Sequence, residues 1–284
     1  MKESFKYFSI GNINTFLKNN NAAPLKKWGQ NFLIDSNIIQ IILNQYNLKP
    51  EETEVIVEIG PGLGAITNNL DYFKKQIYLF EIDPILIKNL KENNFNKSPY
   101  ILIEGDFLKT YTILNEKSFF CFGNLPYYIS TEILTTLLLE CRGLKGGIFM
   151  LQKEFVEKII KETSSIGIFL HSFGEWNHIK NVSPSCFYPS PKTESSLLFF
   201  KKFENQILTS DETKVLQKIL RGFFWGKRKT IQKNIKDSPF FHDSDREKIL
   251  SIFKSELNLS GNERAEDLKK EDFYKLSKYL QNLN

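Results

Sequence analysis

The chain is 284 residues long, a length that suits one large domain or two of ordinary size. Hydrophobic residues make up 41% of it, enough to build a packed core, and this composition excludes a chain that is disordered throughout. The formal net charge of +5 is a mild excess, which permits an anionic partner without identifying one.

The first predicted elements surround a short motif near residue 30. Residues 1–24 mix polar and apolar types and end in asparagines, alanines and a proline, which predicts an arm rather than a core element. Asp35 or Ser36 is expected to cap a helix whose apolar residues recur between positions 38 and 43. The Gly-Gln-Asn-Phe-Leu sequence at residues 29–33 is either an ordinary lead-in loop or a loop that folds over a ligand.

A glycine-rich turn follows the first predicted strand, residues 55–59. Gly60, Gly62 and Gly64 let the backbone turn sharply and approach a ligand, because no Cβ stands in the way. A helix is expected from about Ala65. The succession of strand, glycine turn and helix predicts the entry to a nucleotide-binding crevice.

Acidic residues stand at the ends of the next two predicted strands. Glu81, near the end of strand 76–83, lies 21 residues after Gly60. At that spacing an acid accepts hydrogen bonds from ribose hydroxyls, and no neighbouring basic residue suits a 2′-phosphate; the alternative is an exposed acid at a strand end. Asp106 follows strand 100–104 and either accepts from an exocyclic amine such as adenine N6 or caps a helix.

The fourth predicted strand, residues 119–122, leads into the most informative short stretch of the chain. Asn124 offers a side-chain carbonyl, Pro126 stiffens the turn and removes a donor, and Tyr127 offers a flat face with a hydroxyl. A rigid acceptor beside an aromatic ring, at the carboxyl end of a strand, suits a planar substrate that carries an amine.

The remaining strands complete the prediction of an α/β fold. A fifth strand is expected at 147–151, a helix at 152–161, a sixth strand at 166–173, a proline-rich loop with two aromatics at 182–192, and a last strand at 195–202. Strands that alternate with helices predict a sheet that is mostly parallel.

The pattern changes from about Phe203, where apolar residues take helical spacing and no convincing strand remains. We therefore expect two domains, residues 1–203 and a small helical domain at 204–284. Residues 214–236 contain eight basic residues and no acidic one. Such a run is either a solvated helix face or a surface for an anionic partner.

Several classes of site find no support in the sequence. The three cysteines are widely spaced with no CxxC pair, and the three histidines form no ligand pattern, so we expect no disulfide framework and no metal. No apolar run approaches the roughly 20 residues of a membrane helix, and the N-terminus lacks the apolar core of a signal peptide. We expect a cytoplasmic protein that does not act at a membrane.

Taken together, seven short motifs between Lys26 and Leu276 resemble those of the ribosomal RNA adenine N6-dimethyltransferase family, and most closely its bacterial small-subunit (16S) branch. The order and spacing of the motifs make the match specific, although each alone is modest. They are Lys-Lys-Trp-Gly-Gln-Asn-Phe-Leu from Lys26, Val-Glu-Ile-Gly-Pro-Gly-Leu-Gly from Val57, Glu-Ile-Asp from Glu81, Glu-Gly-Asp-Phe-Leu from Glu104, Asn-Leu-Pro-Tyr from Asn124, Phe-Tyr-Pro-Ser-Pro-Lys from Phe187 and Lys-Arg-Lys-Thr from Lys227.

The resemblance implies a class I S-adenosylmethionine methyltransferase, Rossmann-like with a seven-stranded, mostly parallel sheet and a small all-α C-terminal domain. It implies N6,N6-dimethylation of two adjacent adenosines near the 3′ end of 16S ribosomal RNA. The cofactor residues carried over by motif are Asn31, Leu33, Gly60, Glu81, Asp106 and Asn124. The catalytic loop carried over by motif is Asn124, Leu125, Pro126 and Tyr127, with Phe187 as an aromatic that helps to hold the target base.

The resemblance also favours RNA for the basic run, with Arg221, Lys227, Arg228 and Lys229 as phosphate contacts. It implies the small ribosomal subunit as partner, a role in its biogenesis, and a monomeric enzyme. Residues 156–167 depart from the family pattern, because this segment is short and lacks the usual Arg and Pro.

Three other functions remain open from the residues. A large-subunit adenine methyltransferase of the macrolide-resistance kind would share the fold and the pocket. An RNA- or DNA-binding assembly or transcription factor would share the fold without catalysis, but the intact site residues argue against it. A methyltransferase for a small molecule would not need the basic helical domain.

Overall fold

The computed structural model describes residues 6–20, 30–46 and 53–281. The chain forms two compact units. The first comprises Met1–Val156 and Trp176–Lys202, and the second comprises Glu157–Glu175 and Phe203–Asn284. This division differs from the boundary expected after residue 203, because a helical segment from the middle of the chain groups with the C-terminal helices.

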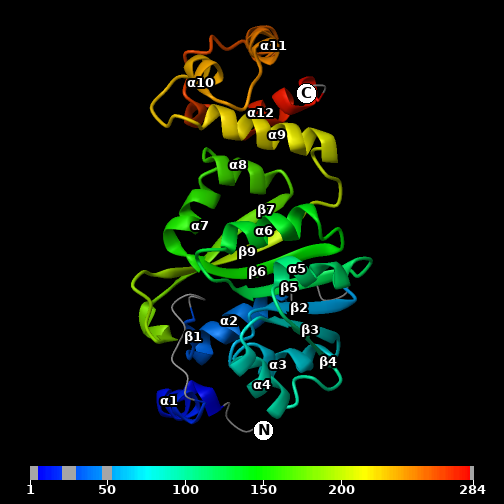
Figure 1. The fold of residues 1–284 in the computed structure, drawn as a ribbon, viewed down its shortest axis with the longest axis vertical. Coiled ribbons are helices and arrows are strands. Elements are labelled where there is room, and N and C mark those ends of the chain that lie inside the picture. The colour runs from blue at the N-terminus through cyan, green and yellow to red at the C-terminus, as the bar shows by residue number, and fades with distance from the viewer. Residues whose placement is uncertain (1–5, 21–29, 47–52, 282–284) are drawn as a thin grey trace. The chain divides into compact units, whose positions relative to one another are not determined.

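A seven-stranded sheet forms the centre of the first unit, in the order β4-β3-β2-β5-β6-β9-β7 (Figure 1). Strands β4 to β6 run parallel, whereas β9 pairs antiparallel with β6. The predicted mostly parallel sheet is therefore confirmed. The strands are β2 (Val55–Ile59), β3 (Gln76–Glu81), β4 (Tyr100–Glu104), β5 (Phe119–Asn124), β6 (Leu144–Gln152), β7 (Gly174–Val182) and β9 (Ser195–Lys202).

Helices connect these strands as the alternating pattern predicted. Every residue of β2, which lies between β3 and β5, is buried, which explains its near-continuous apolar sequence. Asp35 begins the first of these helices, because its Oδ1 accepts from the backbone N–H groups of Asn37 and Ile38 at 2.9 and 3.1 Å. The connecting helices are α2 (Ser36–Tyr46), α3 (Thr67–Leu70), η4 (Asp71–Phe73), α4 (Pro84–Glu92), α5 (Phe107–Thr110), η5 (Tyr111–Leu114), α6 (Ser130–Leu139) and α7 (Lys153–Ile160).

The main core of the first unit lies between α2 and one face of the sheet. Alternate residues of the strands, such as Ile56 on β2 and Phe122 on β5, point to the same face. They bury their side chains with Ile39 and Ile42 of α2. The period of two along the strands and the helical spacing on α2 thus converge on one apolar layer.

The N-terminal residues correct the sequence-based expectation of an arm. Residues 6–19 form η1 (Lys6–Phe8) and α1 (Ile10–Asn19), and α1 buries Ile13 and Leu17 one turn apart. The surrounding asparagines and lysines concealed this short apolar stripe. Residues 21–29, which include the Lys-Lys-Trp-Gly part of the first motif, lie outside the described residues.

A second, two-stranded sheet joins two distant motifs. Strand β1 (Phe32–Leu33) pairs antiparallel with β8 (Phe187–Tyr188). The backbone N–H of Ile34 extends this pairing by donating to the carbonyl of Cys186 at 2.9 Å. The proline-rich segment expected to be a loop thus contains a short strand, preceded by η6 (Pro184–Cys186).

The prediction of a strand at residues 166–173 is wrong. This segment is the helix α8 (Ser165–His171), and the sheet strand is β7 (Gly174–Val182), which immediately follows it. Ser164 caps the helix, because its Oγ accepts from the backbone N–H of Gly167 at 2.9 Å. A short apolar run is compatible with a buried strand or a buried helix, and the cap selects the helix.

The second unit is helical, as predicted. Tyr274 of α12 donates a hydrogen bond to the carbonyl of Ile168 in α8 at 2.8 Å, and Lys270 pairs with Glu162 at 2.6 Å. These contacts explain why Glu157–Glu175 belongs to this unit. Its C-terminal elements are α9 (Ser210–Phe223), α10 (Ile231–Asp237), α11 (Asp243–Ser255), η7 (Ala265–Asp267) and α12 (Lys270–Tyr279) (Figure 1).

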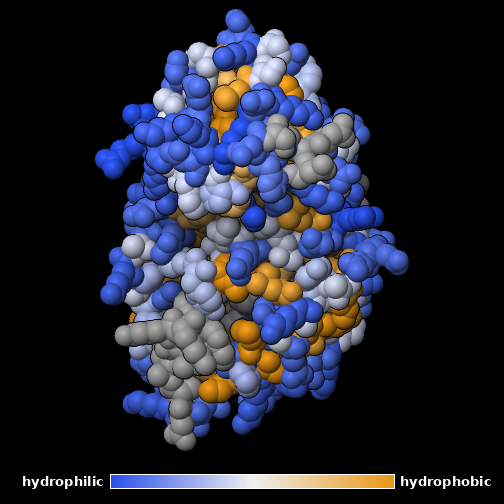
Figure 2. All heavy atoms as spheres, turned by 45° about the horizontal axis from the view of Figure 1, so that its top comes forward, coloured by the Kyte–Doolittle hydropathy of each residue, from blue (hydrophilic) through white to orange (hydrophobic). Residues whose placement is uncertain are grey.

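The surface is predominantly hydrophilic on the face shown in Figure 2, with hydrophobic residues in smaller groups between the charged ones. This mixture is usual for a globular protein. Among the helices that the structure describes, none combines the length and the apolar character needed to cross a membrane.

Candidate active site

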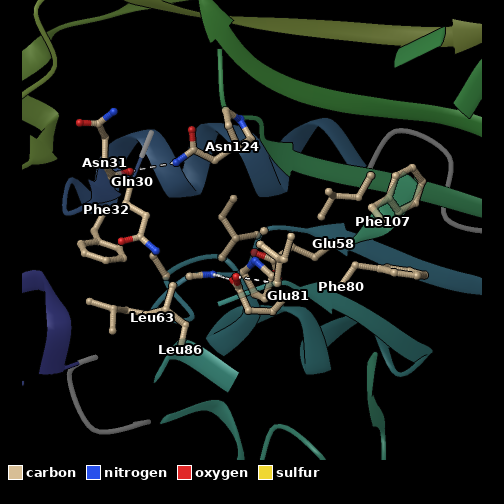
Figure 3. Close-up of a pocket in the computed structure, with 18 of the residues that line it drawn as sticks. Gln30, Asn31, Phe32, Glu58, Leu63, Phe80, Glu81, Leu86, Phe107 and Asn124 are labelled. Atoms are coloured by element: carbon tan, nitrogen blue, oxygen red, sulfur yellow. Dashed lines mark hydrogen bonds between the residues drawn. The ribbon is translucent and has the colours of Figure 1, made fainter. Parts of the chain in front are cut away.

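A single pocket brings the six predicted cofactor residues together. It encloses about 1100 Å³, including its open mouth, beside the carboxyl ends of β2, β3 and β5 (Figure 3). In an open α/β sheet this edge is where ligands bind. The predicted residues in its lining are Asn31, Leu33, Gly60, Glu81, Asp106 and Asn124.

The glycine turn forms one wall of the pocket. Gly60 and Gly62 have φ angles of 71° and 60°, in the left-handed region that favours glycine. A Cβ added at Gly62 would lie 3.5 Å from the ring of Phe32, and one at Gly60 would lie 3.8 Å from the carbonyl oxygen of Asn124. Both are ordinary contact distances, so the turn owes its glycines to backbone conformation rather than to the closeness of neighbouring residues.

Glu81 is buried, with 5% of its surface exposed, so it is not the exposed strand-end acid considered as the alternative. Its Oε2 accepts from the backbone N–H of Gly62 at 3.1 Å, and its Oε1 accepts from Ile82 and Asp83 at 2.9 and 3.0 Å. Burial raises the pKa of Glu81 to about 7, although these hydrogen bonds oppose the shift. One side chain thus joins the glycine turn to the end of β3 while it lines the pocket.

Glu58 is a pocket residue that the motif analysis did not select. It is 2% exposed, and the hydroxyl of Thr67 donates to its Oε2 at 2.6 Å. Burial, with a smaller contribution from the charge of Glu81, raises the pKa of Glu58 to about 8, although the hydrogen bond from Thr67 opposes the shift. The sequence signal that could have identified Glu58 is a carboxyl group in an otherwise apolar strand.

Asp106 caps a helix, one of the two roles considered for it, and it also lines the pocket. Its Oδ1 accepts from the backbone N–H of Leu108 at 3.0 Å and caps α5, while the residue also lines the pocket. Tyr128, which is 62% exposed, lines the same part of the molecule. Partial burial and the charge of Asp106 raise the pKa of Tyr128. The two side chains therefore share one end of the pocket.

Hydrogen bonds hold the loop that precedes β1 across the pocket. Gln30 Nε2 donates to Oδ2 of Asp83 at 2.6 Å. Asn124 Nδ2 donates to the carbonyl of Asn31 at 3.1 Å (Figure 3). The second bond fixes the orientation of the Asn124 amide. It leaves Oδ1 of Asn124 as an acceptor at the pocket, as the predicted role requires.

The Asn124–Tyr127 turn has defined backbone partners. The N–H of Leu125 donates to the carbonyl of Met150, and the carbonyl of Pro126 accepts from Ile129, each at 3.2 Å. Two backbone hydrogen bonds therefore hold the turn in place. Within the described part of the chain, the Leu125 carbonyl accepts no hydrogen bond.

The side chains of the catalytic motif divide into two groups. Asn124 and Pro126 line the pocket, whereas Leu125 is 1% exposed and packs beneath the turn. Tyr127 is half-buried, and its hydroxyl shares a hydrogen bond of 2.8 Å with Ser195 of β9. That bond orients the Tyr127 ring from a strand that the motif itself does not contain.

Phe187 does not line this pocket. It is 3% exposed on β8, where it pairs with Leu33 and belongs to the main core cluster. Its position therefore supports β1, and a contact with a substrate base would require the ring to become accessible.

The predicted RNA residues differ in the partners that they already have. Lys229 pairs with Asp237 at 2.8 Å, an acid that follows the basic run directly. Among the described residues, Arg221, Lys227 and Arg228 form no ion pair, and all three are exposed. The basic surface thus rests on these three side chains more than on Lys229.

Tyr7 is the pocket residue with the weakest sequence signal. Nothing in its local sequence distinguishes it from the many other aromatics of the chain. It reaches the pocket because η1 and α1 pack against β1, the glycine turn and α4, a tertiary arrangement without a local signature.

Comparisons with known proteins identify the family of this chain. A family model described as ribosomal RNA adenine dimethylase matches residues 22–282. A protein named ribosomal RNA small subunit methyltransferase A from Borrelia garinii is 35% identical over 237 residues, which cover 82% of each chain. A protein of the same name from Clostridium botulinum is 32% identical over 265 residues, which cover 89% of this chain and 92% of the relative.

A solved structure shares the fold. The dimethyladenosine transferase from Plasmodium falciparum superposes with a TM-score of 0.73 at 24% identity, over 89% of this chain and 98% of that one. The family match extends over nearly the whole chain and includes every residue of the pocket described above except Tyr7. This chain belongs to the ribosomal RNA adenine dimethylase family.

Proposed function

We propose that this protein transfers methyl groups from S-adenosylmethionine to N6 of two adjacent adenosines near the 3′ end of small-subunit ribosomal RNA. The products are N6,N6-dimethyladenosines, and the reaction serves small-subunit biogenesis. The observation that carries this proposal is the convergence of Gly60, Glu81, Asp106 and Asn124 on one pocket, in a chain whose relatives are named ribosomal RNA small subunit methyltransferases.

The chemistry of the pocket fits S-adenosylmethionine. Glu81 supplies a buried acceptor for ribose hydroxyls, and Asp106 supplies an acceptor for the adenine amine. Gly60, which has no side chain, forms the pocket wall beside the methionine part of the cofactor. The buried carboxyl of Glu58 lines the same pocket. When bound, the cofactor supplies an electrophilic methyl group on a positively charged sulfur.

The chain's own contribution to catalysis lies in the Asn124–Tyr127 turn. The N6 lone pair of adenine is delocalised into the ring, so the amine is a poor nucleophile. Oδ1 of Asn124 and the carbonyl of Leu125 accept hydrogen bonds from this amine, orient its lone pair and stabilise the positive charge that develops on nitrogen. The methylated nitrogen loses its proton to water, and no dedicated base is needed.

An aromatic surface holds the target base in line. The Tyr127 ring, oriented by Ser195, stacks against the adenine and restricts its approach. Stacking of a base on an aromatic side chain contributes roughly 1–3 kcal/mol. Phe187 assists from the neighbouring strand β8 when the RNA opens access to its ring.

The helical unit contributes phosphate contacts. Arg221, Lys227 and Arg228 are exposed cations that supply electrostatic affinity for the RNA backbone. Lys229 contributes less, since Asp237 already neutralises it. The enzyme acts as a monomer on the small subunit.

The experiment that tests the proposal supplies purified small and large ribosomal subunits, taken from cells that lack this protein, with methyl-labelled S-adenosylmethionine. We expect label in the small-subunit RNA as dimethyladenosine. Label in the large-subunit RNA alone would indicate instead that the protein is an adenine methyltransferase of the large-subunit class. Absence of label with either subunit would favour a non-catalytic binding protein.

A further inference from the structure

The N-terminal segment, residues 6–19, packs against the wall of the cofactor pocket. Tyr7 is 5% exposed and belongs to the pocket lining. Its hydroxyl donates to Oδ1 of Asn89 on α4 at 2.6 Å, and Asn89 is itself 2% exposed. A buried hydrogen bond between a terminal segment and α4 fixes the Tyr7 ring at the edge of the pocket.

The apolar face of α1 continues this contact. Ile13 and Leu17 form a cluster with Phe32, Leu63 and Leu86 that is separate from the main core of the unit. The last three residues belong to β1, to the glycine turn and to α4, so the cluster contacts three walls of the pocket. The N-terminal segment therefore packs against the outer side of the pocket walls.

A further hydrogen bond connects the N-terminal segment to the strand that carries Phe187. The hydroxyl of Tyr188 donates to Oδ1 of Asn14 on α1 at 2.6 Å. Tyr188 is also the register partner of Phe32 in the β1–β8 pair. These contacts join α1 to β1, which belongs to the predicted cofactor site, and to β8, which carries Phe187.

We infer that the N-terminal segment is a functional part of the cofactor site: Tyr7 forms a wall that contacts the bound cofactor, and α1 holds residues 30–33 against it. This inference rests on the proposed function, because it assigns S-adenosylmethionine to the pocket. Cofactor binding then stabilises the N-terminal segment, and the segment in turn strengthens cofactor binding.

The affinity test uses full-length variants titrated with S-adenosylhomocysteine by calorimetry, well below their unfolding temperatures. Tyr7→Ala removes the wall and is expected to weaken binding by roughly tenfold. Tyr7→Phe keeps the ring and loses only the bond to Asn89, so its effect is smaller. Lys18→Ala, on the exposed side of α1, is the matched control and is expected to bind as the unmutated chain does.

Hydrogen exchange on the unmutated chain supplies a second readout, independent of how any variant folds. S-Adenosylhomocysteine is expected to slow amide exchange in residues 10–19 as well as in residues 30–33. Protection confined to residues 30–33, or Tyr7→Ala binding within about twofold of the unmutated chain, would overturn the inference and leave the proposed function intact. No binding by the unmutated chain would overturn both.

Discussion

Glu81 combines two tasks in one carboxylate. It accepts three backbone N–H bonds that tie the glycine turn to β3, and in the proposed complex it also accepts from ribose hydroxyls. A carboxylate has room for about four hydrogen bonds, so both tasks are compatible only while it is ionised. If the proposed function holds, the protonation state of Glu81 is therefore expected to control cofactor binding.

We predict that cofactor affinity falls as the pH is lowered through about 7, the pKa to which burial raises Glu81. Below this pH the free protein holds Glu81 protonated, and binding must release the proton, so the dissociation constant rises toward roughly tenfold per pH unit. Calorimetry with S-adenosylhomocysteine from about pH 5.5 to about pH 8.5, a range of about three pH units, covers the transition.

Two variants separate the contributions to this pH dependence. Glu81→Gln is expected to bind weakly at every pH with a flatter profile, because an amide does not titrate. Glu58→Gln removes the other raised carboxyl, whose pKa is about 8, and retains the Glu81 transition. A wild-type profile that stays flat across this range would show that Glu81 does not control binding.

Tyr127 offers a test that distinguishes its ring from its hydroxyl. Tyr127→Phe loses only the hydrogen bond to Ser195, so we predict a loss of no more than a few-fold in kcat/KM. Tyr127→Ala loses the stacking surface, worth roughly 1–3 kcal/mol, and is expected to lower kcat/KM for RNA by about tenfold to a hundredfold. Equal losses in both variants would assign the function to the hydroxyl instead.

At the scale of secondary-structure elements, α8 shows how a cap decides between helix and strand. Ser164→Ala removes the side chain that accepts from Gly167, and we predict a loss of about 1 kcal/mol in the free energy of unfolding. Denaturant unfolding measures the loss, and Thr163→Ala at the adjacent exposed position is the control. Indistinguishable stability of the two variants would contradict the capping role.

The elements that the sequence predicted well are those with a strong local signal. Strand β2 is apolar throughout and stops at Gly60, so its bounds were predictable from the sequence. Strand β7 was missed because it is an edge strand with a largely exposed, polar sequence, whereas α8 beside it has the apolar run. Helix α1 was missed because only Ile13 and Leu17 are fully buried on it.

The site follows the same division. Glu81, Asp106 and Asn124 each stand at or just after the end of a strand, so the parallel sheet brings them together without further information. Ser195 beneath Tyr127 and Tyr7 at the pocket depend on tertiary packing of distant segments. Such partners have no spacing rule in the sequence and are visible only in the folded chain.

The segment between α9 and α10 yields a prediction about RNA affinity. Replacing Lys227 and Arg228 by alanine is expected to weaken RNA binding and to reduce the slope of log affinity against log salt by about two, since each phosphate contact contributes roughly one. Lys229→Ala is the matched control and is expected to change the slope less, because Asp237 holds Lys229 in an ion pair. Filter binding across salt concentrations measures all three slopes.

At the scale of the whole molecule, the two units suggest a division of labour. The first unit contains the complete pocket and the Asn124–Tyr127 turn, and the second presents exposed cations on a helical framework. We expect cofactor affinity to be unchanged by the Lys227 and Arg228 substitutions, because these residues lie in a different unit from the pocket.

The central claim is dimethylation of small-subunit RNA, and mass-spectrometric mapping of N6,N6-dimethyladenosine in ribosomal RNA tests it most directly. In cells that lack this protein, we predict that the two adjacent dimethyladenosines near the 3′ end of small-subunit RNA disappear. The unmutated chain restores them, and Asn124→Ala, which loses the acceptor for the amine, does not. Retention of both modifications in the deletion strain, or their loss from large-subunit RNA instead, would contradict the account.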